Sequence, residues 1–339
     1  MTHNVVGWRK NMATIKDVAN KAGLTVGTVS RVINNRGYIS EETKKKVFAV
    51  MKELNYQPNE VARSLSKQKS SIIGVIVPHI EHPYFAKMVS SIERAVSKEK
   101  YKIILCDSKE EKEKEIDYIE MFKGNRVAGV ILCSGVDPKK FIDLNIPLVT
   151  IERDLEDCIT SIECDNYHGG VLAAKHLYEC GCKNVVHLSG IQNENMPADA
   201  REEGFASECE KHGVSHKEVK HEMGLYYKMD YHEYITRVLQ EDKSIDGIFA
   251  SSDLIAAQVI QVCSKLGIKI PEQKKLIGFD DVIVASLTTP TITSISQPVR
   301  DMAEYGVQTI IKAQNGEEVQ TKVIFPVTLI KRDSTRVLS

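Results

Sequence analysis

Polar side chains that follow apolar, strand-like runs are the residues of this chain best suited to hold a ligand. Where parallel strands end, ligands bind beyond their carboxyl ends, so side chains at several such ends converge on one region. Carboxylates can bind paired hydroxyls, an arginine offers a fork of donors, and aromatic rings can cover a sugar ring. This mixture predicts a sugar-binding cleft, and its candidate residues are Tyr84, Phe85, Glu152, Asp165, Arg201, Ser252 and Asp280.

A second group of residues has the chemistry of zinc ligands. His176, Cys180, Cys182 and His187 lie close together in the stretch HLYECGCKNVVH. However, the two cysteines flank a glycine that should end a helix, and His187 falls inside an expected strand, which makes convergence awkward. We therefore expect ordinary buried thiols and no metal or other cofactor.

Motifs for enzyme catalysis are missing from the sequence. It has no G-x-G-x-x-G after a strand, no Walker A motif and no G-x-S-x-G elbow. We therefore predict a binding protein and not an enzyme.

The length and composition are those of a soluble protein of two or three folding units. The chain has 339 residues, of which 42% are hydrophobic and 27% charged. Its apolar runs are far shorter than the roughly 20 residues that span a bilayer. No secretory signal opens the chain, and the eight cysteines are scattered. We therefore expect a cytoplasmic location with reduced thiols, and a flexible tail at residues 1–12.

The net charge of −1 conceals a sharp division along the chain. Residues 1–70 carry a net charge of +8, and residues 71–339 carry −9. A basic module attached to an acidic body attracts phosphate backbones while limiting non-specific binding elsewhere. This division favours nucleic-acid binding by the first seventy residues.

The stretch TIKDVANKAGLTVGTVSRVIN at 14–34 has the pattern of a helix-turn-helix. Apolar residues recur at helical spacing on both sides of Ala22-Gly23-Leu24. Thr14 with Asp17 predicts a capping box, and Thr25 predicts a second N-cap. The second helix must then turn outward the residues Val26, Gly27, Ser30 and Arg31.

Two more helices are predicted before residue 70. Ser40 caps the first of them, and its expected buried stripe is Val47, Phe48, Val50, Met51 and Leu54. After Pro58, Asn59 caps a short helix on which Val61, Ala62 and Leu65 share a face beside Arg63 and Lys67. Because nucleation is costly, so short a helix needs a partner, which is its twin in a dimer, DNA, or both.

The helix-turn-helix, its spacing to NYQPNEVARSL and the alternating segments after it resemble the LacI/GalR family of bacterial transcriptional repressors, from about residue 13 to 334. The resemblance implies that the second helix enters the major groove and that the hinge helices of two subunits enter the minor groove. By resemblance Val26, Gly27 and Arg31 read bases, with Arg31 on a guanine. Leu65 is the wedge between central base steps, although it could instead be a core residue. The resemblance also assigns to DNA the residues Thr14, Thr25, Thr28, Ser30, Asn34, Asn59, Ala62, Arg63 and Lys67.

From residue 72 onward, short apolar strands alternate with amphipathic helices, which predicts an α/β body with parallel sheets. The resemblance implies two periplasmic-binding-protein-like subdomains. The expected division is a helix-turn-helix domain at 13–58, a hinge helix and linker at 59–70, one subdomain at 71–164 plus 294–326, and another at 165–293 plus 327–339.

By resemblance, Arg201 and Asp280 hold the effector most directly, and the other five candidates flank it. Ser252 stands where relatives usually carry asparagine, which suggests altered specificity. Asp280 has an alternative interpretation as the cap of the following turn.

The resemblance implies a homodimeric repressor of a carbohydrate operon. It would bind a palindromic double-stranded operator, respond to a small sugar or sugar phosphate, and have no membrane partner. SIECDNYHGGVLAAKHL looks most similar to sucrose-operon repressors of Gram-positive bacteria, and a ribose or other sugar regulator stays open. Two alternatives remain: control by a protein corepressor, and a solute receptor without a DNA role.

Overall fold

The structure is a computed structural model that describes residues 13–57, 70–109, 111–133, 146–153, 160–191 and 196–336. The chain divides into two compact units, residues 1–70 and 71–339, and each is considered by itself. The predicted tail at 1–12 and the predicted hinge residues Asn59, Ala62, Arg63, Leu65 and Lys67 lie outside the described residues.

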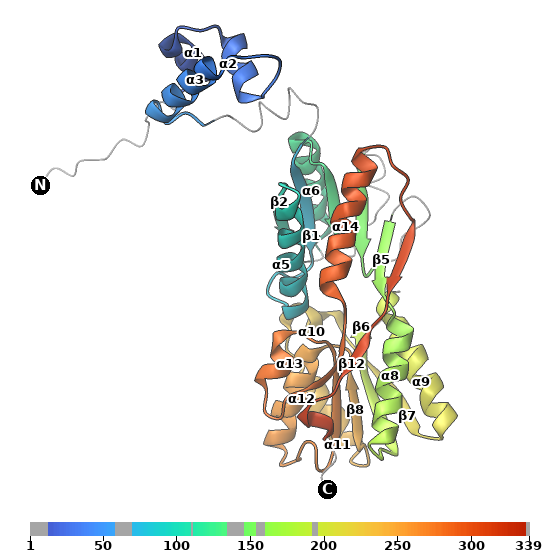
Figure 1. The fold of residues 1–339 in the computed structure, drawn as a ribbon. Coiled ribbons are helices and arrows are strands. Elements are labelled where there is room, and N and C mark those ends of the chain that lie inside the picture. The colour runs from blue at the N-terminus through green and yellow to red at the C-terminus, as the bar shows by residue number, and fades with distance from the viewer. Residues whose placement is uncertain are drawn as a thin grey trace, which may run out of the picture. The chain divides into compact units, whose positions relative to one another are not determined.

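The first unit contains the three expected helices, α1 (Ile15–Ala22), α2 (Val26–Ile33) and α3 (Glu41–Glu53) (Figure 1). The capping box is present: Thr14 Oγ1 accepts from the Asp17 N–H at 3.4 Å, and Asp17 Oδ2 accepts from the Thr14 N–H at 2.7 Å. Thr25 and Ser40 cap α2 and α3 as predicted. Gly23 ends α1 with a φ of 65°, a conformation that favours glycine.

The buried faces of these three helices form one small core. It consists of Val18, Ala19, Val29, Val32, Val47 and Met51. Phe48 differs from the prediction, because its side chain is 52% exposed. Position 48 lies one residue, and so about 100° of helix rotation, away from the face that carries Val47 and Met51.

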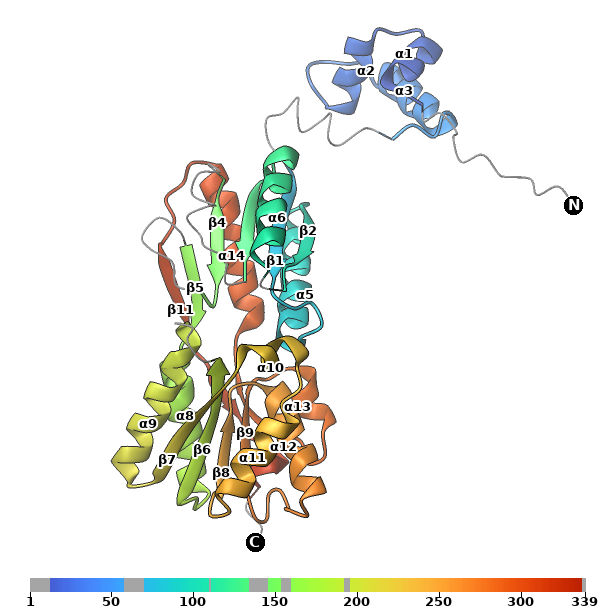
Figure 2. The ribbon, with the colours of Figure 1, turned by 180° about the vertical axis from the view of Figure 1, so that it is seen from behind.

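The second unit contains two six-stranded sheets in the part of the chain described (Figures 1 and 2). The first is parallel throughout, in the order β11 (Lys322–Phe325), β5 (Thr160–Cys164), β4 (Leu148–Ile151), β3 (Gly129–Leu132), β1 (Ile72–Val77) and β2 (Lys102–Asp107). The second has the order β12 (Thr328–Ile330), β10 (Thr293–Ser296), β9 (Lys275–Asp280), β8 (Gly247–Ala250), β6 (Asn184–Ile191) and β7 (Ser215–His221). Only β12 is antiparallel to its neighbour among these described strands.

Helices pack on both faces of the sheets, which confirms the predicted α/β class. The helices of the first subdomain are α5 (Pro83–Lys98), α6 (Lys112–Asn125) and α14 (Val299–Gln314). The second subdomain has α8 (Asn166–Glu179), α9 (Ala200–His212), α10 (Met223–Lys228), α11 (His232–Glu241), α12 (Asp253–Lys265) and α13 (Ile283–Leu287). Figure 2 shows α8 and α9 side by side next to β6 and β7.

The chain passes between the two subdomains at three places. Two of them lie after β5 and between β11 and β12. The third differs from the predicted boundary at 293/294, because β10 pairs with β9 and β12 up to Ser296. Ile295 is fully buried within this strand. The chain therefore leaves the second sheet after Ser296, three residues later than predicted.

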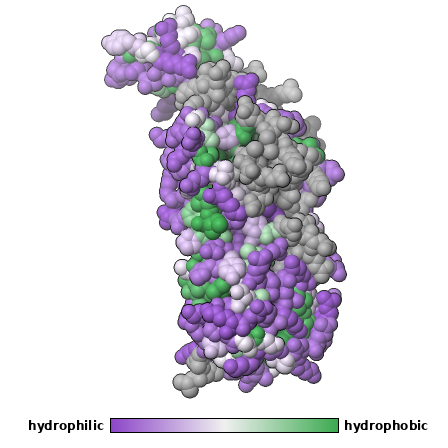
Figure 3. Space-filling view, turned by 90° about the vertical axis from the view of Figure 1, so that its right-hand side faces the viewer, coloured by the Kyte–Doolittle hydropathy of each residue, from purple (hydrophilic) through white to green (hydrophobic). Residues whose placement is uncertain are grey.

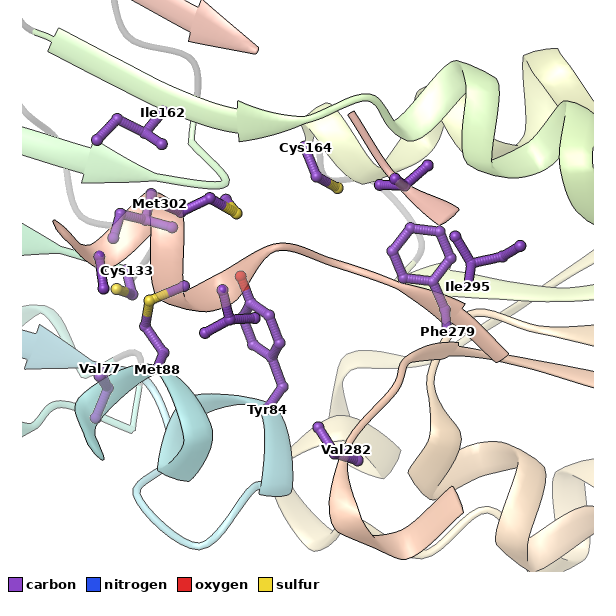
Figure 4. Close-up of a cluster of buried hydrophobic side chains, with 14 of the residues drawn as sticks. Val77, Tyr84, Met88, Cys133, Ile162, Cys164, Phe279, Val282, Ile295 and Met302 are labelled. Atoms are coloured by element: carbon purple, nitrogen blue, oxygen red, sulfur yellow. The ribbon is translucent and has the colours of Figure 1, made fainter. Parts of the chain in front are cut away.

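A continuous apolar cluster contains residues of both subdomains. It includes Val77, Met88 and Ile162 from the first subdomain, and Phe279 and Ile295 from the second (Figure 4). The surface is mostly polar on the face shown in Figure 3, where the apolar patches are small and separate. Among the described residues, no helix has the length and apolarity needed to cross a bilayer.

Candidate DNA-binding surface and effector cleft

The second helix of the helical unit presents a narrow exposed face. Val29 and Val32 are buried against α1 and α3, which turns the opposite side outward. Val26 is 41% exposed, and Gly27 and Arg31 are exposed beside it. The structure therefore places the three predicted base-reading residues together on one surface.

Local hydrogen bonds set the side chains around this face. Arg31 Nε donates to the Gly27 carbonyl at 3.4 Å, and its terminal nitrogens have no partner among the described residues. Asn34 Nδ2 donates to the Ser30 carbonyl at 2.9 Å. The hydroxyls of Thr25 and Thr28 bond to each other at 2.9 Å. The hydroxyls thus lie at the N-terminus of α2, and the Arg31 guanidinium and the Asn34 amide lie toward its C-terminal end. Groups of these kinds commonly contact phosphates.

Tyr38 is a feature of the same unit that the sequence analysis assigned no role. It lies between α2 and α3 and its side chain is 99% exposed. The available signal was an aromatic residue inside the polar turn NNRGY.

A pocket lies between the two subdomains of the body, and six of the seven predicted effector residues line it. They come from α5, from the end of β4, from α9, from the N-terminus of α12 and from the end of β9: Tyr84, Phe85, Glu152, Arg201, Ser252 and Asp280. The convergence arises because these strands all end on the side that faces the other subdomain.

Asp165 is placed differently from the other six. It is the N-cap of α8, where Oδ1 accepts from the His168 N–H at 2.9 Å, and it is outside the described lining of the pocket. Asp165 follows β5 directly, as we expected, but its carboxylate caps the N-terminus of α8 instead of lining the pocket.

Arg201 is rigidly held at one wall of the pocket. Its Nε donates to Asn166 Oδ1 at 2.7 Å, and one terminal nitrogen donates to the Ser251 carbonyl at 2.8 Å. The guanidinium lies 3.5 Å from the centre of the Phe279 ring. These three contacts fix the orientation of the guanidinium and of its remaining N–H donors.

Two glycines let α9 bring Arg201 to that wall. A Cβ on Gly204 would lie 2.0 Å from the Tyr167 carbonyl oxygen, and a Cβ on Gly170 would lie 2.0 Å from the Arg201 carbonyl oxygen. The backbones of α8 and α9 can therefore approach closely only because both positions are glycine.

Glu152 links the pocket to the chain that crosses between subdomains. Its two carboxylate oxygens accept from the Cys164 N–H at 2.6 Å and from Asn166 Nδ2 at 3.0 Å. Its φ of 56° is in the left-handed region, which few side chains adopt without compensation. The compensating bonds make Glu152 a residue that positions Asn166, and through Asn166 also Arg201.

Asp280 has the most altered acidity among the lining carboxylates. Burial raises its pKa to about 7, while Arg201, Gln297 and Lys87 oppose the shift. Gln297 Nε2 donates to Asp280 Oδ1 at 2.7 Å, and Gln297 Oε1 is buried without a hydrogen-bond partner. Sequence analysis missed Gln297, although a polar residue at a crossing between subdomains was an available signal.

The Tyr84 hydroxyl completes this group. It is buried without a hydrogen-bond partner, and burial together with the nearby Glu152 and Asp280 raises its pKa well above the usual value. Figure 4 shows the Tyr84 ring extending from α5 with its hydroxyl directed away from the helix. Unpaired buried polar groups are costly, so the Tyr84 hydroxyl and Gln297 Oε1 are two hydrogen-bonding atoms whose capacity is unused within the described residues.

Comparison with known proteins settles the family. The model of the bacterial regulatory proteins of the lacI family matches residues 14–59, and that of the periplasmic binding protein-like domain matches 174–335. The chain is 36% identical over 328 residues to the ribose operon repressor of Halalkalibacterium halodurans, covering 96% of this chain and 98% of that protein. It is 35% identical to the sucrose operon repressor of Streptococcus mutans, covering 95% and 99%. The chain belongs to the lacI family.

Solved structures of similar proteins agree with this assignment. A periplasmic binding protein/LacI transcriptional regulator from Alkaliphilus metalliredigens, complexed with D-xylulofuranose, is 33% identical. It has a TM-score of 0.72 and covers 79% of this chain and 100% of its own. The Lac repressor dimer bound to operator has a TM-score of 0.84 and covers 96% and 99%, and at 24% identity it supports the fold alone.

In this LacI-family chain the four possible zinc ligands do not meet. His176 Nε2 bonds to Thr335 Oγ1 at 2.9 Å, with Cys180 Sγ 3.7 Å away. Cys182 Sγ lies 3.7 Å from the Asp246 carbonyl, and His187 Nδ1 lies 2.6 Å from Glu202 Oε2. Every cysteine within the described residues is a free thiol.

The pocket also has lining residues that sequence analysis did not single out as effector ligands. Among those described, they include polar groups from β6, from β7, from α9 and from the N-cap position before α9: His187, Ser189, Asp199, Glu202, Glu218 and His221. Two of them, Glu218 and His221, lie on β7, whose alternating sequence SHKEVKH lacks an apolar run. We therefore did not predict that strand or the carboxylate that it brings into the cleft.

Proposed function

We propose that this chain is a transcriptional repressor of a carbohydrate-utilisation operon, and that it binds a palindromic operator as a homodimer. A small sugar or sugar phosphate in the cleft sets its DNA affinity. The observation that carries the proposal is the presence, in one chain, of a helix-turn-helix with an exposed face on α2 and a cleft lined by polar and aromatic side chains.

On the DNA side, α2 enters the major groove. Arg31 contacts a guanine edge, with Val26 and Gly27 against neighbouring bases. Phosphates are bound by Thr14, Thr25, Thr28, Ser30 and Asn34. In the proposed hinge at 59–70, Asn59, Ala62, Arg63 and Lys67 contact DNA and Leu65 inserts into the minor groove. Two copies read the two half-sites of a palindrome, which gives specificity to a domain as small as 13–58.

On the effector side, Arg201, Asp280, Tyr84 and Gln297 bind sugar hydroxyls, and Phe85 offers an aromatic face. The relatives support a sugar, since two of them are named as ribose and sucrose operon repressors. Solved family structures hold D-xylulofuranose and cellobiose. The chain binds this effector and does not convert it.

Contacts between the subdomains couple the cleft to the rest of the body. Lys87 Nζ, on α5, donates to the carbonyls of Asp280 at 3.1 Å and Asp281 at 2.8 Å. His79 packs edge-on against Tyr226 with ring centres 5.1 Å apart. A ligand that binds more tightly when the two subdomains are closed around it increases the population of that closed arrangement. If DNA binding also differs between the two arrangements, the ligand changes the affinity for DNA by the same coupling free energy.

The test selects operator DNA from a random library with the purified full-length chain and then titrates sugars against the complex. We expect a palindromic sequence, and one sugar that changes the operator affinity at least about fivefold. Asp280→Ala should keep operator binding and lose the sugar response, while Asp301→Ala, at an exposed position of α14, should keep both. Operator binding that ignores every sugar would contradict the effector half of the proposal and favour control by a protein partner. Selection of no sequence would contradict the DNA half.

A further inference from the structure

One end of the cleft is an acidic corner, formed by His187, Ser189, Glu202 and Glu218. Ligand atoms of His187, Glu202 and Glu218 all lie within 4.8 Å of one another. His187 Nδ1 donates to Glu202 Oε2 at 2.6 Å, and Ser189 Oγ donates to Glu218 Oε1 at 2.6 Å. Burial lowers the pKa of His187, so the imidazole is neutral near pH 7 and does not cancel the carboxylate charge.

Negative groups outnumber positive ones around the whole pocket. Its described lining contains five carboxylates, Glu152, Asp199, Glu202, Glu218 and Asp280, and two guanidinium groups, Arg153 and Arg201. Lys220, which is not among the described lining residues, lies 3.6 Å from Asp199 Oδ1 and 3.7 Å from Glu218 Oε1. Lys87, which contacts the Asp280 and Asp281 carbonyls, adds a further cation at the other side of the lining. The surplus of negative charge therefore lies at Asp199, Glu202 and Glu218, where an entering dianion meets like charge.

Arg201, one of the two guanidinium groups of the lining, is already partly engaged. Arg201 donates to Asn166 Oδ1 and to the Ser251 carbonyl, and its guanidinium plane lies over the Phe279 ring. A helix N-terminus attracts anions, but α9 carries Glu202 and Glu203 in its first turn, and α12 carries the buried Asp253. The N-termini of α9 and α12 are therefore balanced by carboxylates, whereas α5, whose first turn also lines the pocket, has no acidic residue there.

Neutral hydroxyls suit the same arrangement well. Carboxylate oxygens of Glu202 and Glu218 can each accept a hydrogen bond from a sugar hydroxyl, because their side chains are 20% and 27% exposed and line the cavity. A hydroxyl donates to these oxygens without adding charge, whereas a phosphate has three acceptor oxygens that face other acceptors.

We infer that the effector is an unphosphorylated sugar, and that Glu202 and Glu218 determine this specificity by excluding the phosphate ester. The inference rests on the proposed function, and it narrows the choice of effector that the function leaves open.

The first experiment measures dissociation constants of the full-length protein by calorimetry for matched pairs. The pairs are ribose and ribose 5-phosphate, fructose and fructose 6-phosphate, glucose and glucose 6-phosphate, and sucrose and sucrose 6-phosphate. We expect one neutral sugar to bind at least about tenfold more tightly than its phosphate. A phosphate that binds as tightly or more tightly overturns this inference and leaves the proposed sugar-responsive repressor intact. Absence of binding by all eight compounds overturns the effector half of the proposed function, and this inference with it.

The second experiment removes the two charges without changing side-chain shape. In Glu202→Gln/Glu218→Gln, the ratio of phosphate to neutral-sugar affinity should rise about tenfold or more over the unmodified protein. The matched control is Glu203→Gln, which removes the same charge from the adjacent exposed position of α9 and should leave the ratio unchanged. If the double variant does not fold, Glu218→Gln alone should raise the ratio several-fold. An unchanged ratio in the folded variant overturns the role of the two carboxylates.

Discussion

Gln297 Nε2 donates a hydrogen bond to Asp280 Oδ1 at 2.7 Å, which ties a segment crossing between the subdomains to the central carboxylate of the cleft. Gln297 directly precedes Pro298, the N-cap of α14, and Asp280 ends β9, so this contact spans the junction itself. Asp280 has a φ of 98°, in the left-handed region, and Asp281 follows with 49°. The backbone of Asp280 thus has an unfavourable conformation, which its hydrogen bonds with Gln297 and with Lys87 help to maintain.

The raised pKa of Asp280 predicts a pH-dependent stability. Its carboxyl has a pKa of about 7 in the folded protein against 3.8 for the ordinary group. Between these values the folded state keeps a proton that the unfolded state has lost, so its contribution to stability falls as pH rises and is lost above about pH 7. Relative to Asp280→Asn, the free energy of unfolding should fall by about 1.4 kcal/mol for each pH unit between pH 5 and 7. Urea unfolding at four pH values measures this slope. Asp301→Asn, on the exposed face of α14, should reproduce the unmodified slope.

The glycine contact between α8 and α9 predicts a strong effect of Gly204→Ala. The added Cβ would lie 2.0 Å from the Tyr167 carbonyl oxygen, so the helices must separate and Arg201 must move. We expect a loss of about 3 kcal/mol in the free energy of unfolding, together with weaker effector binding. Gly124→Ala, in α6 with nothing within 4 Å of the new Cβ, should cause neither change. Equal stability of the two variants would show that the helices can separate freely.

The bridge from Lys87 to the Asp280 and Asp281 carbonyls predicts a role in closing the cleft. Lys87→Met keeps the length of the side chain and removes the donor from both bonds. We expect effector affinity to fall about fivefold to tenfold, because a charged donor to buried carbonyls contributes about 1 to 1.5 kcal/mol or more. Calorimetric titration checks this change. Lys98→Met removes a charge from the same helix, where Lys98 pairs with the half-buried Glu304 on α14, and should leave affinity unchanged.

The exposed guanidinium of Arg31 predicts the origin of operator discrimination. Arg31→Ala should cost about 1 to 3 kcal/mol of preference for the selected operator and keep salt-sensitive binding to random DNA. Competition binding at two salt concentrations separates these effects. Lys52→Ala, at the exposed end of α3, removes the same charge and should preserve the preference. If Arg31→Ala weakens both kinds of DNA equally, Arg31 contacts phosphate rather than a base.

The sequence was sufficient for the helical unit because its signals act over a few residues. Thr14 with Asp17, Thr25, and Gly23 each satisfy backbone groups within one turn, so the helix boundaries follow from local chemistry. Phe48 is an exception, because the predicted buried face of α3 included this residue, whose side chain is half exposed. The alternation of strands and helices after residue 72 was likewise readable, because buried parallel strands are short continuous apolar runs.

The cleft was only partly predictable. Strand ends supplied Tyr84, Arg201 and Asp280, but the same rule placed Asp165 in the cleft, where the structure has it capping α8 instead. Glu218 was missed because β7 is a polar edge strand, and Glu202 was missed because it looks like any acidic residue in a first helical turn.

By itself, then, the sequence determined the helix-turn-helix, the α/β class and the family. Helix caps, apolar periodicity and motif spacing depend on residues that are close in sequence, so they do not depend on how the elements pack together. The tertiary structure decided which side chains share the cleft and which of its charges are unbalanced. Those facts depend on where the chain crosses between the sheets and on how closely α8 and α9 pack, and both are set by contacts between residues far apart in sequence.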